Sequence, residues 1–189
     1  MRVAVEYVTL PRDGERENGD AALVRWLEDG ALVVVLDALG HGAPAAEAAR
    51  VAVRHLEGAP IDHGLRPVVE SLHEALRGTR GAAAMLLLIR RGSLEGCAVG
   101  NVSLRAYRAR VPALLSPGVL GGSLARLHVF NAELSPGARL LIFSDGITPR
   151  FDEEAWRRAA GPEACRAIIT RYRKAHDDAT VLVTDIEAA

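Results

Sequence analysis

The chain has 189 residues, which is enough for one domain with a single sizeable hydrophobic core. Its composition is that of an ordinary globular protein, with 49% hydrophobic and 25% charged residues. A net charge of −1 and the lack of a basic block argue against nucleic-acid binding, which needs clustered Lys and Arg.

Alternating or β-branched apolar runs predict the strands, and Ala-rich or amphipathic segments predict the helices. In chain order we predict strands at 3–10, 21–27 and 31–37, helices at 43–56 and 66–77, strands at 82–90, 93–100, 102–108, 127–134 and 139–145, helices at 152–158 and 162–174, and a strand at 180–186. Short links between neighbouring strands indicate antiparallel pairing. Because helices come in pairs and do not alternate with strands, we predict an α+β layered sandwich in one domain, 1–189.

Other features of the sequence concern compartment and assembly. Cys97 and Cys165 lie far apart and form no metal-binding motif, which favours a reducing cytosol. The first 15 residues lack the long apolar region of a signal peptide, and the longest apolar stretch, 81–89, is about half of what spans a bilayer. We expect a cytoplasmic protein without membrane contact. No feature of the sequence indicates assembly, and we expect a monomer. Arginine supplies nearly all of the positive charge, which we attribute to genomic base composition.

Acidic residues stand at the ends of several apolar runs. They are Asp20, Asp37, Asp145 and the pair Asp177-Asp178. A carboxylate at a strand end is held by the sheet but can point out of it. Several such carboxylates, brought together by strand pairing, form an oxygen-rich site suited to Mg²⁺ or Mn²⁺. Each Asp alone is equally compatible with a solvated turn, and the four together indicate metal-assisted phosphoryl chemistry.

The segment DALGHG, residues 37–42, is the sharpest local feature. An apolar run ends in Asp37 and enters a Gly-x-Gly loop that opens a helix, where glycines allow a ligand to approach the backbone. A dinucleotide-binding loop is an alternative, since Gly40-x-Gly42-x-x-Ala45 fits its loose form. Two points count against it: Asp37 would repel a pyrophosphate, and no strand-ending acid follows about 20 residues later.

Several segments together resemble the PPM (type 2C) metal-dependent phosphatases, and within them the SpoIIE-type branch and its small RsbX-like members. These segments are DALGHG (37–42), TRGAAA (79–84), GNVSLRAY (100–107), LLIFSDGITPRFD (140–152) and DDATVLV (177–183). They occur in family order along nearly the whole chain. The resemblance implies a four-layer αββα sandwich of two antiparallel sheets flanked by helices. It also implies two Mn²⁺ or Mg²⁺ ions at one edge of the sheets.

The resemblance assigns ligand roles to five positions. It implies that Asp37 bridges both metals and that Ala38 contributes its backbone carbonyl. Asp145 and Asp177 are expected to be further ligands of one metal, and Asp20 to serve the other metal directly or through water. Asp37 and Asp145 are therefore the expected catalytic residues.

Four neighbouring residues complete the expected site. Gly146 is expected to keep the loop beside Asp145 open. His41 is a candidate proton donor or phosphate contact, although a loop histidine without a catalytic role is the alternative. Asp178 and Asn101 are candidate supporting residues, with turn geometry the alternative for Asn101.

The sequence also departs from the family pattern. Ala38 replaces the usual glycine, and Leu39 stands where many relatives have a histidine proposed as general acid.

We therefore expect a serine/threonine protein phosphatase that hydrolyses phosphate esters by a metal-bridged hydroxide. The resemblance implies phosphorylated STAS-domain proteins of the stressosome, or anti-anti-sigma factors, as substrates. Two alternatives stay open. One is a pseudophosphatase that acts as a binding module, which Ala38 and Leu39 favour. The other is a nucleotide-binding domain that uses the loop 40–42.

Overall fold

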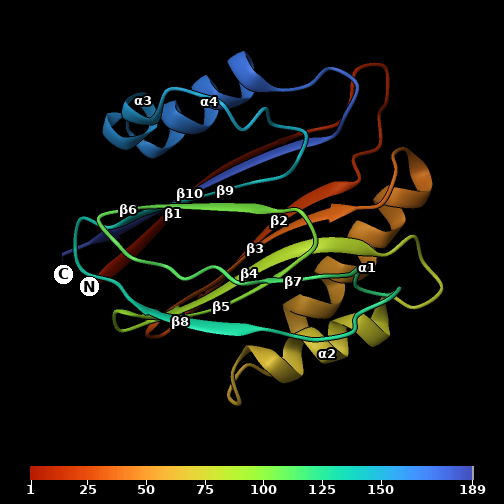
Figure 1. Cartoon of the computed structure of the whole chain (residues 1–189), viewed down its shortest axis with the longest axis horizontal. Coiled ribbons are helices and arrows are strands. Elements are labelled where there is room, and N and C mark those ends of the chain that lie inside the picture. The colour runs from red at the N-terminus through yellow and green to blue at the C-terminus, as the bar shows by residue number, and fades with distance from the viewer. Residues whose placement is uncertain (189) are drawn as a thin grey trace.

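The structure, a computed structural model that describes residues 1–188, contains two stacked sheets with a helix pair outside each (Figure 1). Position 189 of the predicted domain lies outside the described residues. The first sheet has the spatial order β1 (Arg2–Leu10), β10 (Ala179–Glu187), β9 (Arg139–Phe143) and β6 (Ser103–Tyr107). The second has the order β2 (Asp20–Leu27), β3 (Gly30–Ala38), β4 (Ala82–Arg90), β5 (Ser93–Val99) and β7 (Leu115–Ser116), and β8 (Val129–Glu133) also pairs with β5.

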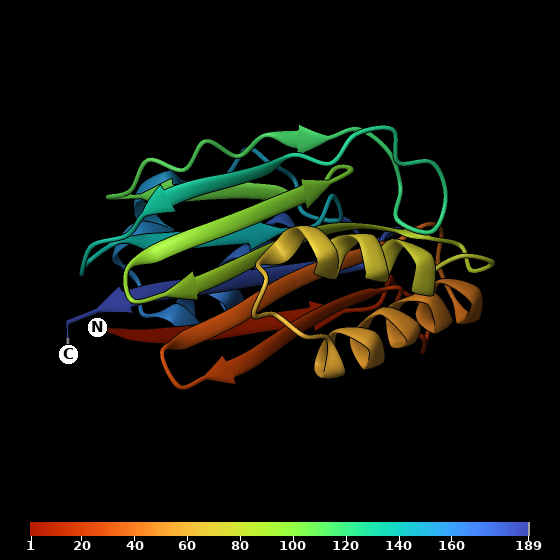
Figure 2. The same ribbon diagram turned by 90° about the horizontal axis from the view of Figure 1, so that it is seen from below.

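The helices form the two outer layers. Helices α1 (Ala43–Gly58) and α2 (Leu65–Ala75) lie next to each other on the outer face of the second sheet (Figure 2). Helices α3 (Glu153–Arg158) and α4 (Gly161–Tyr172) cover the first sheet. The predicted four-layer α+β sandwich is confirmed. One pairing differs, because β5 and β7 run parallel over two residue pairs, within the Pro- and Gly-rich stretch where the sequence predicts no strand.

Three apolar clusters hold these layers together, and β3 contributes to two of them. Leu32, Val34 and Leu36 pack towards α1 and α2, whereas Val33 and Val35 pack between the two sheets. Both faces of the strand are buried, which explains why its sequence is a continuous apolar run without alternation. The third cluster lies between the first sheet and helices α3 and α4.

The hairpin between β4 and β5 shows how local sequence sets the turns. Arg91 and Gly92 have φ values of 47° and 88°. Positive φ at both central residues is typical of a two-residue turn whose twist matches the flanking strands. The turn therefore keeps β4 and β5 in antiparallel register.

The two chain ends lie together at one end of the molecule (Figure 1), since Arg2 is paired with Glu187 across β1 and β10. The opposite end of the sheets carries the end of β3, the start of β2 and the loop after β9. No helix within residues 1–188 is both long and apolar enough to cross a membrane.

Candidate metal centre

Strand pairing brings the predicted carboxylates to the same end of the molecule. Asp37 lies near the end of β3 and is directly opposite Asp20, the first residue of β2. In the other sheet, Asp145 follows the end of β9 and Asp177 precedes the start of β10, two strands that are paired there through Phe143 and Val181. Residues separated by more than 100 positions in the sequence thus meet where the two sheets end.

Three of these carboxylates share one hollow of about 250 Å³. It is lined by Asp37, Leu39, Gly40, His41, Asn101, Asp145 and Asp177. The end of β3 and four connecting loops contribute to this lining. Such a concentration of carboxylates would repel a pyrophosphate, so the loop 40–42 belongs to an acidic hollow and does not form a dinucleotide-binding turn.

The crowding of negative charge is visible in the proton affinity of Asp37. Burial first, and then the nearby charges of Asp145, Asp177 and Asp178, raise the pKa of Asp37 from 3.8 to about 7. The pKa of Asp177 is also raised, first by burial and then by Asp145, while Lys174 acts in the opposite direction. A divalent cation placed among these groups would relieve their mutual repulsion.

The raised pKa of Asp37 leads to a prediction about pH. Between pH 3.8 and about 7 the folded protein holds more protons at this site than the unfolded chain, so this contribution to stability is lost as the pH rises. A metal ligand must be deprotonated, so metal binding competes with this proton. We expect Mn²⁺ to raise Tm more at pH 8 than at pH 5.5, measured by thermal denaturation against a chelator control. A larger shift at pH 5.5 would contradict the assignment of Asp37.

Asp20 does not line this hollow. The side chain is 5% exposed, and one of its oxygens accepts a 2.6 Å hydrogen bond from the Ser144 hydroxyl. Burial raises the pKa of Asp20 well above its usual value, and the Asp37 charge adds to this effect. Its assignment as a ligand of the second metal stays a prediction. So does that of the Ala38 carbonyl, which belongs to a residue buried at the end of β3.

Asp178 differs from its neighbour Asp177 in what its carboxylate contacts. Its two oxygens accept hydrogen bonds from the backbone N–H groups of Arg12, at 2.8 Å, and Gly19, at 2.9 Å. The side chain is 4% exposed. Asp178 therefore secures the loop between β1 and β2 against the start of β10, and this contact holds Asp20 in place.

Other predicted supporting residues also surround the hollow. The Asn101 side-chain amide donates a 2.6 Å hydrogen bond to the Asp145 carboxylate, so Asn101 orients that group. His41 is half exposed, and its Nδ1 lies 3.5 Å from the Glu15 carboxylate. Gly146 is predicted to keep the loop beside Asp145 open, but the structure gives a different reason for a glycine here. A Cβ at this position would lie 1.8 Å from the backbone oxygen of Asp178. Gly146 permits close backbone contact and does not line an open space.

The donor atoms of the hollow fit a hard divalent cation. Asp37, Asp145 and Asp177 present carboxylate oxygens, the ligand type that Mg²⁺ and Mn²⁺ prefer. Within residues 1–188, no three potential ligand side chains already converge into a compact metal-binding group.

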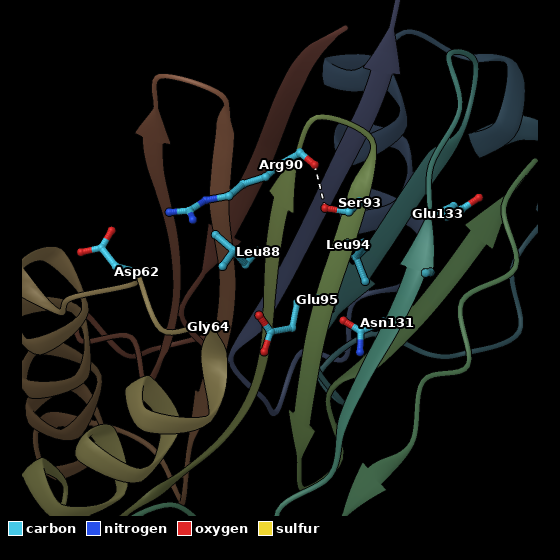
Figure 3. Close-up of a pocket in the computed structure, with 10 residues that line it drawn as sticks. Asp62, Gly64, Leu88, Arg90, Ser93, Leu94, Glu95, Asn131 and Glu133 are labelled. Atoms are coloured by element: carbon cyan, nitrogen blue, oxygen red, sulfur yellow. Dashed lines mark hydrogen bonds between the residues drawn. The ribbon is translucent and has the colours of Figure 1, made fainter.

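A larger hollow of about 620 Å³ lies away from these carboxylates, beside the tip of the β4–β5 hairpin (Figure 3). Its main polar group has a structural role. The Glu95 carboxylate accepts a 3.0 Å hydrogen bond from the backbone N–H of Leu65 at the start of α2. A Cβ on Gly64 would lie 2.8 Å from the same carboxylate. The glycine and the acid together cap the helix, so size alone does not identify the functional site.

Three residues near the centre were missed by sequence reasoning. The Ser144 hydroxyl donates a hydrogen bond to the Asp20 carboxylate and accepts one from the backbone N–H of Thr180. The Glu15 carboxylate lies 3.5 Å from Nδ1 of His41. Lys174 donates a 2.5 Å hydrogen bond from its ammonium group to the backbone oxygen of Asp145. Only Lys174 had a visible signal, because it is the sole lysine of the chain.

Comparison with known proteins agrees with this architecture. A family model described as Stage II sporulation protein E (SpoIIE) matches residues 28–187. A solved structure presented as "The bacterial stressosome: a modular system that has been adapted to control secondary messenger signaling" is 32% identical, with a TM-score of 0.88, and the match covers 97% of this chain and 100% of that chain. The crystal structure of RsbX in complex with magnesium is 21% identical, with a TM-score of 0.84 and coverage of 97% and 94%.

More distant matches share the same fold. The PP2C phosphatase domain of SpoIIE from Bacillus subtilis is 20% identical, with a TM-score of 0.71, and the match covers 98% of this chain and 64% of that chain. The sequence has no significant match among curated proteins.

Two stacked sheets between helix pairs, with carboxylates gathered at one end, define a PPM-type phosphatase, the class of metal-dependent protein serine/threonine phosphatases. The family model covers most of the chain, and the first structural match shares about a third of its residues. The chain belongs to the SpoIIE family.

Proposed function

We propose that the protein is a single phosphatase domain that uses two Mn²⁺ or Mg²⁺ ions to dephosphorylate STAS-domain regulators. One observation carries the catalytic part: Asp37 in β3, and Asp145 and Asp177 in the loops next to β9 and β10, line one hollow. Magnesium in the RsbX complex and two manganese ions in a related phosphatase, PstP, support the choice of cation. The stressosome match at 32% identity and the resemblance to RsbX-like enzymes support the choice of substrate.

The roles of the side chains follow from their placement. When bound, the ions supply Lewis acidity and lower the pKa of water. Asp37, Asp145 and Asp177 would hold the ions, and Asn101 keeps the Asp145 carboxylate oriented through its 2.6 Å hydrogen bond. Asp20 lies against Asp37 and is fixed by Ser144. His41, at the rim and paired with Glu15, is the residue of the lining placed to contact an incoming phosphoprotein or its leaving group.

The test compares wild type with Asp145→Asn. We expect Mn²⁺-dependent hydrolysis of p-nitrophenyl phosphate by wild type, and a loss of at least about 100-fold in kcat/KM, roughly 2.7 kcal/mol, in the variant. Release of phosphate from a phosphorylated STAS domain should exceed release from an unrelated phosphoprotein. Turnover without metal would refute the proposed chemistry. Metal binding without any turnover by wild type would identify a pseudophosphatase.

The location of the protein is part of the same proposal. A STAS-domain regulator of the stressosome or an anti-anti-sigma factor is a cytoplasmic protein, and a phosphatase acting on it would share that compartment. We also propose a monomer, because no feature of the sequence indicates assembly. Fractionation of cells and size-exclusion chromatography with light scattering test these two inferences.

A further inference from the structure

Lys174 occupies an unusual position in this chain. It is the only lysine among 23 basic Lys and Arg residues. It lies between the end of α4 and the start of β10, three residues before Asp177. The other 22 of these basic residues are arginines. The chemical difference between lysine and arginine can therefore explain why a lysine stands at position 174.

The contacts of Lys174 join two loops that carry candidate metal ligands. Its ammonium group donates a 2.5 Å hydrogen bond to the backbone oxygen of Asp145. Its backbone N–H donates to the Gly146 oxygen at 2.8 Å, and its own carbonyl accepts from the Asp177 N–H at 3.3 Å. One residue thus contacts the backbone on both sides, at Asp145–Gly146 and at Asp177.

A short antiparallel ribbon extends these contacts. The Thr148 N–H donates to the Tyr172 oxygen at 2.8 Å, and Ile147 pairs with Arg173. The ribbon fixes the backbone of both loops relative to each other. The ammonium group of Lys174 reaches the backbone oxygen of Asp145, so its positive charge lies close to the carboxylates of the hollow. This charge lowers the pKa of Asp177, against the effect of burial.

The difference between the two basic side chains decides what this position can do. An ammonium is a compact charge on a flexible stem, and here it bonds a carbonyl oxygen while the carboxylates stay available. A guanidinium has a planar fork that pairs with a carboxylate through two parallel hydrogen bonds. An arginine at position 174 would be drawn to the carboxylate of Asp145 or Asp177 and would compete with a metal for its oxygens.

We propose that Lys174 is a positioning residue that tethers the Asp145 and Asp177 loops and supplies a countercharge to their carboxylates without occupying the oxygens that bind metal. This inference rests on the proposed metal-dependent function. It predicts that two substitutions at one position move metal binding in opposite directions.

Lys174→Gln keeps a hydrogen-bond donor for the Asp145 carbonyl but removes the charge. We expect the metal-free variant to have a lower Tm than wild type, because the carboxylates lose their countercharge. Mn²⁺ replaces that charge, so the Mn²⁺-induced rise in Tm should be larger than in wild type. Lys174→Arg keeps the positive charge but introduces a planar guanidinium that can form two parallel hydrogen bonds with a carboxylate. We expect a smaller Mn²⁺-induced rise and a Kd for Mn²⁺ about tenfold weaker by titration calorimetry.

Arg171→Lys is the matched control, because Arg171 is exposed in the last turn of α4 and the swap is the reverse one. Its Mn²⁺ response should equal that of wild type. A purely structural role of Lys174 would lower Tm equally with and without metal. Equal Mn²⁺-induced shifts in all variants, or shifts that change in the same direction in Lys174→Gln and Lys174→Arg, would overturn the proposal.

A second measurement needs no substitution. Labelling with ¹⁵N-lysine yields a single amide signal, that of Lys174, whose N–H donates to the Gly146 oxygen. We expect this signal to shift on saturation with Mg²⁺. If wild type shows metal-dependent turnover but the signal does not move, the Lys174 inference fails alone. If wild type shows neither Mn²⁺ stabilisation nor turnover, the proposed function fails first.

Discussion

Asp37→Asn is expected to abolish metal-dependent turnover and at the same time to raise the Tm of the metal-free protein at pH 8. Asp37 is the most crowded carboxylate of the hollow, because burial and three neighbouring acidic groups raise its pKa to about 7. At pH 8 its charge destabilises the folded state, and asparagine has nearly the same shape without that charge. The same substitution removes the ligand expected to bridge both metals.

The two effects are measured separately. Activity is expressed as kcat/KM on p-nitrophenyl phosphate with Mn²⁺, where we expect a loss of at least about 100-fold. Stability is measured by thermal denaturation in the presence of a chelator. Asp62→Asn is the control, because Asp62 is exposed between α1 and α2, away from the carboxylate hollow, and should change neither quantity. Retention of activity within tenfold, or a lower metal-free Tm, would contradict the role given to Asp37.

Opposite effects on stability and activity are informative because they separate a functional residue from a structural one. Asp178 provides the contrast. Its carboxylate accepts hydrogen bonds from two backbone N–H groups, at Arg12 and Gly19, so its removal would leave two buried donors without partners. The neighbouring Asp177 lines the carboxylate hollow instead. Two adjacent acids therefore differ in their contacts: Asp178 bonds backbone N–H groups, and Asp177 lines the hollow where metal binding is proposed.

Sequence patterns predict the elements well where the signal is local. The apolar run of β3 and the turn at Arg91-Gly92 are examples, since burial on both faces requires apolar residues and the positive φ at Gly92 favours glycine. The sheet order is not local. β1 pairs with β10 at the other end of the chain, and β7 consists of two residues whose pairing depends on β5. Which strands pair with each other is therefore determined only in the folded structure.

The candidate site shows the same division. Strand-end position was enough to predict that Asp37, Asp145 and Asp177 come together. It was not enough to separate the roles of Asp177 and Asp178, because a residue beside a strand can face either way. Ser144 and Lys174 act through atoms of distant segments, a carboxylate on β2 and a carbonyl after β9. Their roles depend on tertiary neighbours, although the singular lysine was visible in the composition.

Gly146→Ala is expected to damage both the fold and the activity, for a reason that involves no charge. A Cβ at this position would lie 1.8 Å from the backbone oxygen of Asp178 and 2.8 Å from its carbonyl carbon. Backbone cannot rotate away as a flexible side chain can, so the Asp145 loop or the start of β10 must move. Overpacking of this kind typically destabilises by about 1–3 kcal/mol.

The same displacement would separate Asp145 from Asp177, which lie on the two segments forced apart. A misplacement of about 1 Å at a reaction centre can lower the rate by roughly 100-fold. We therefore expect weaker Mn²⁺ binding and a large loss of kcat/KM, together with a lower denaturant midpoint. Gly58→Ala is the matched control, because a Cβ at the last residue of α1 would meet nothing within 4 Å. That variant should be as active as wild type and equally or more stable. If Gly146→Ala behaved like Gly58→Ala, the close contact between the loop after β9 and the start of β10 would not be what holds Asp145 and Asp177 in position.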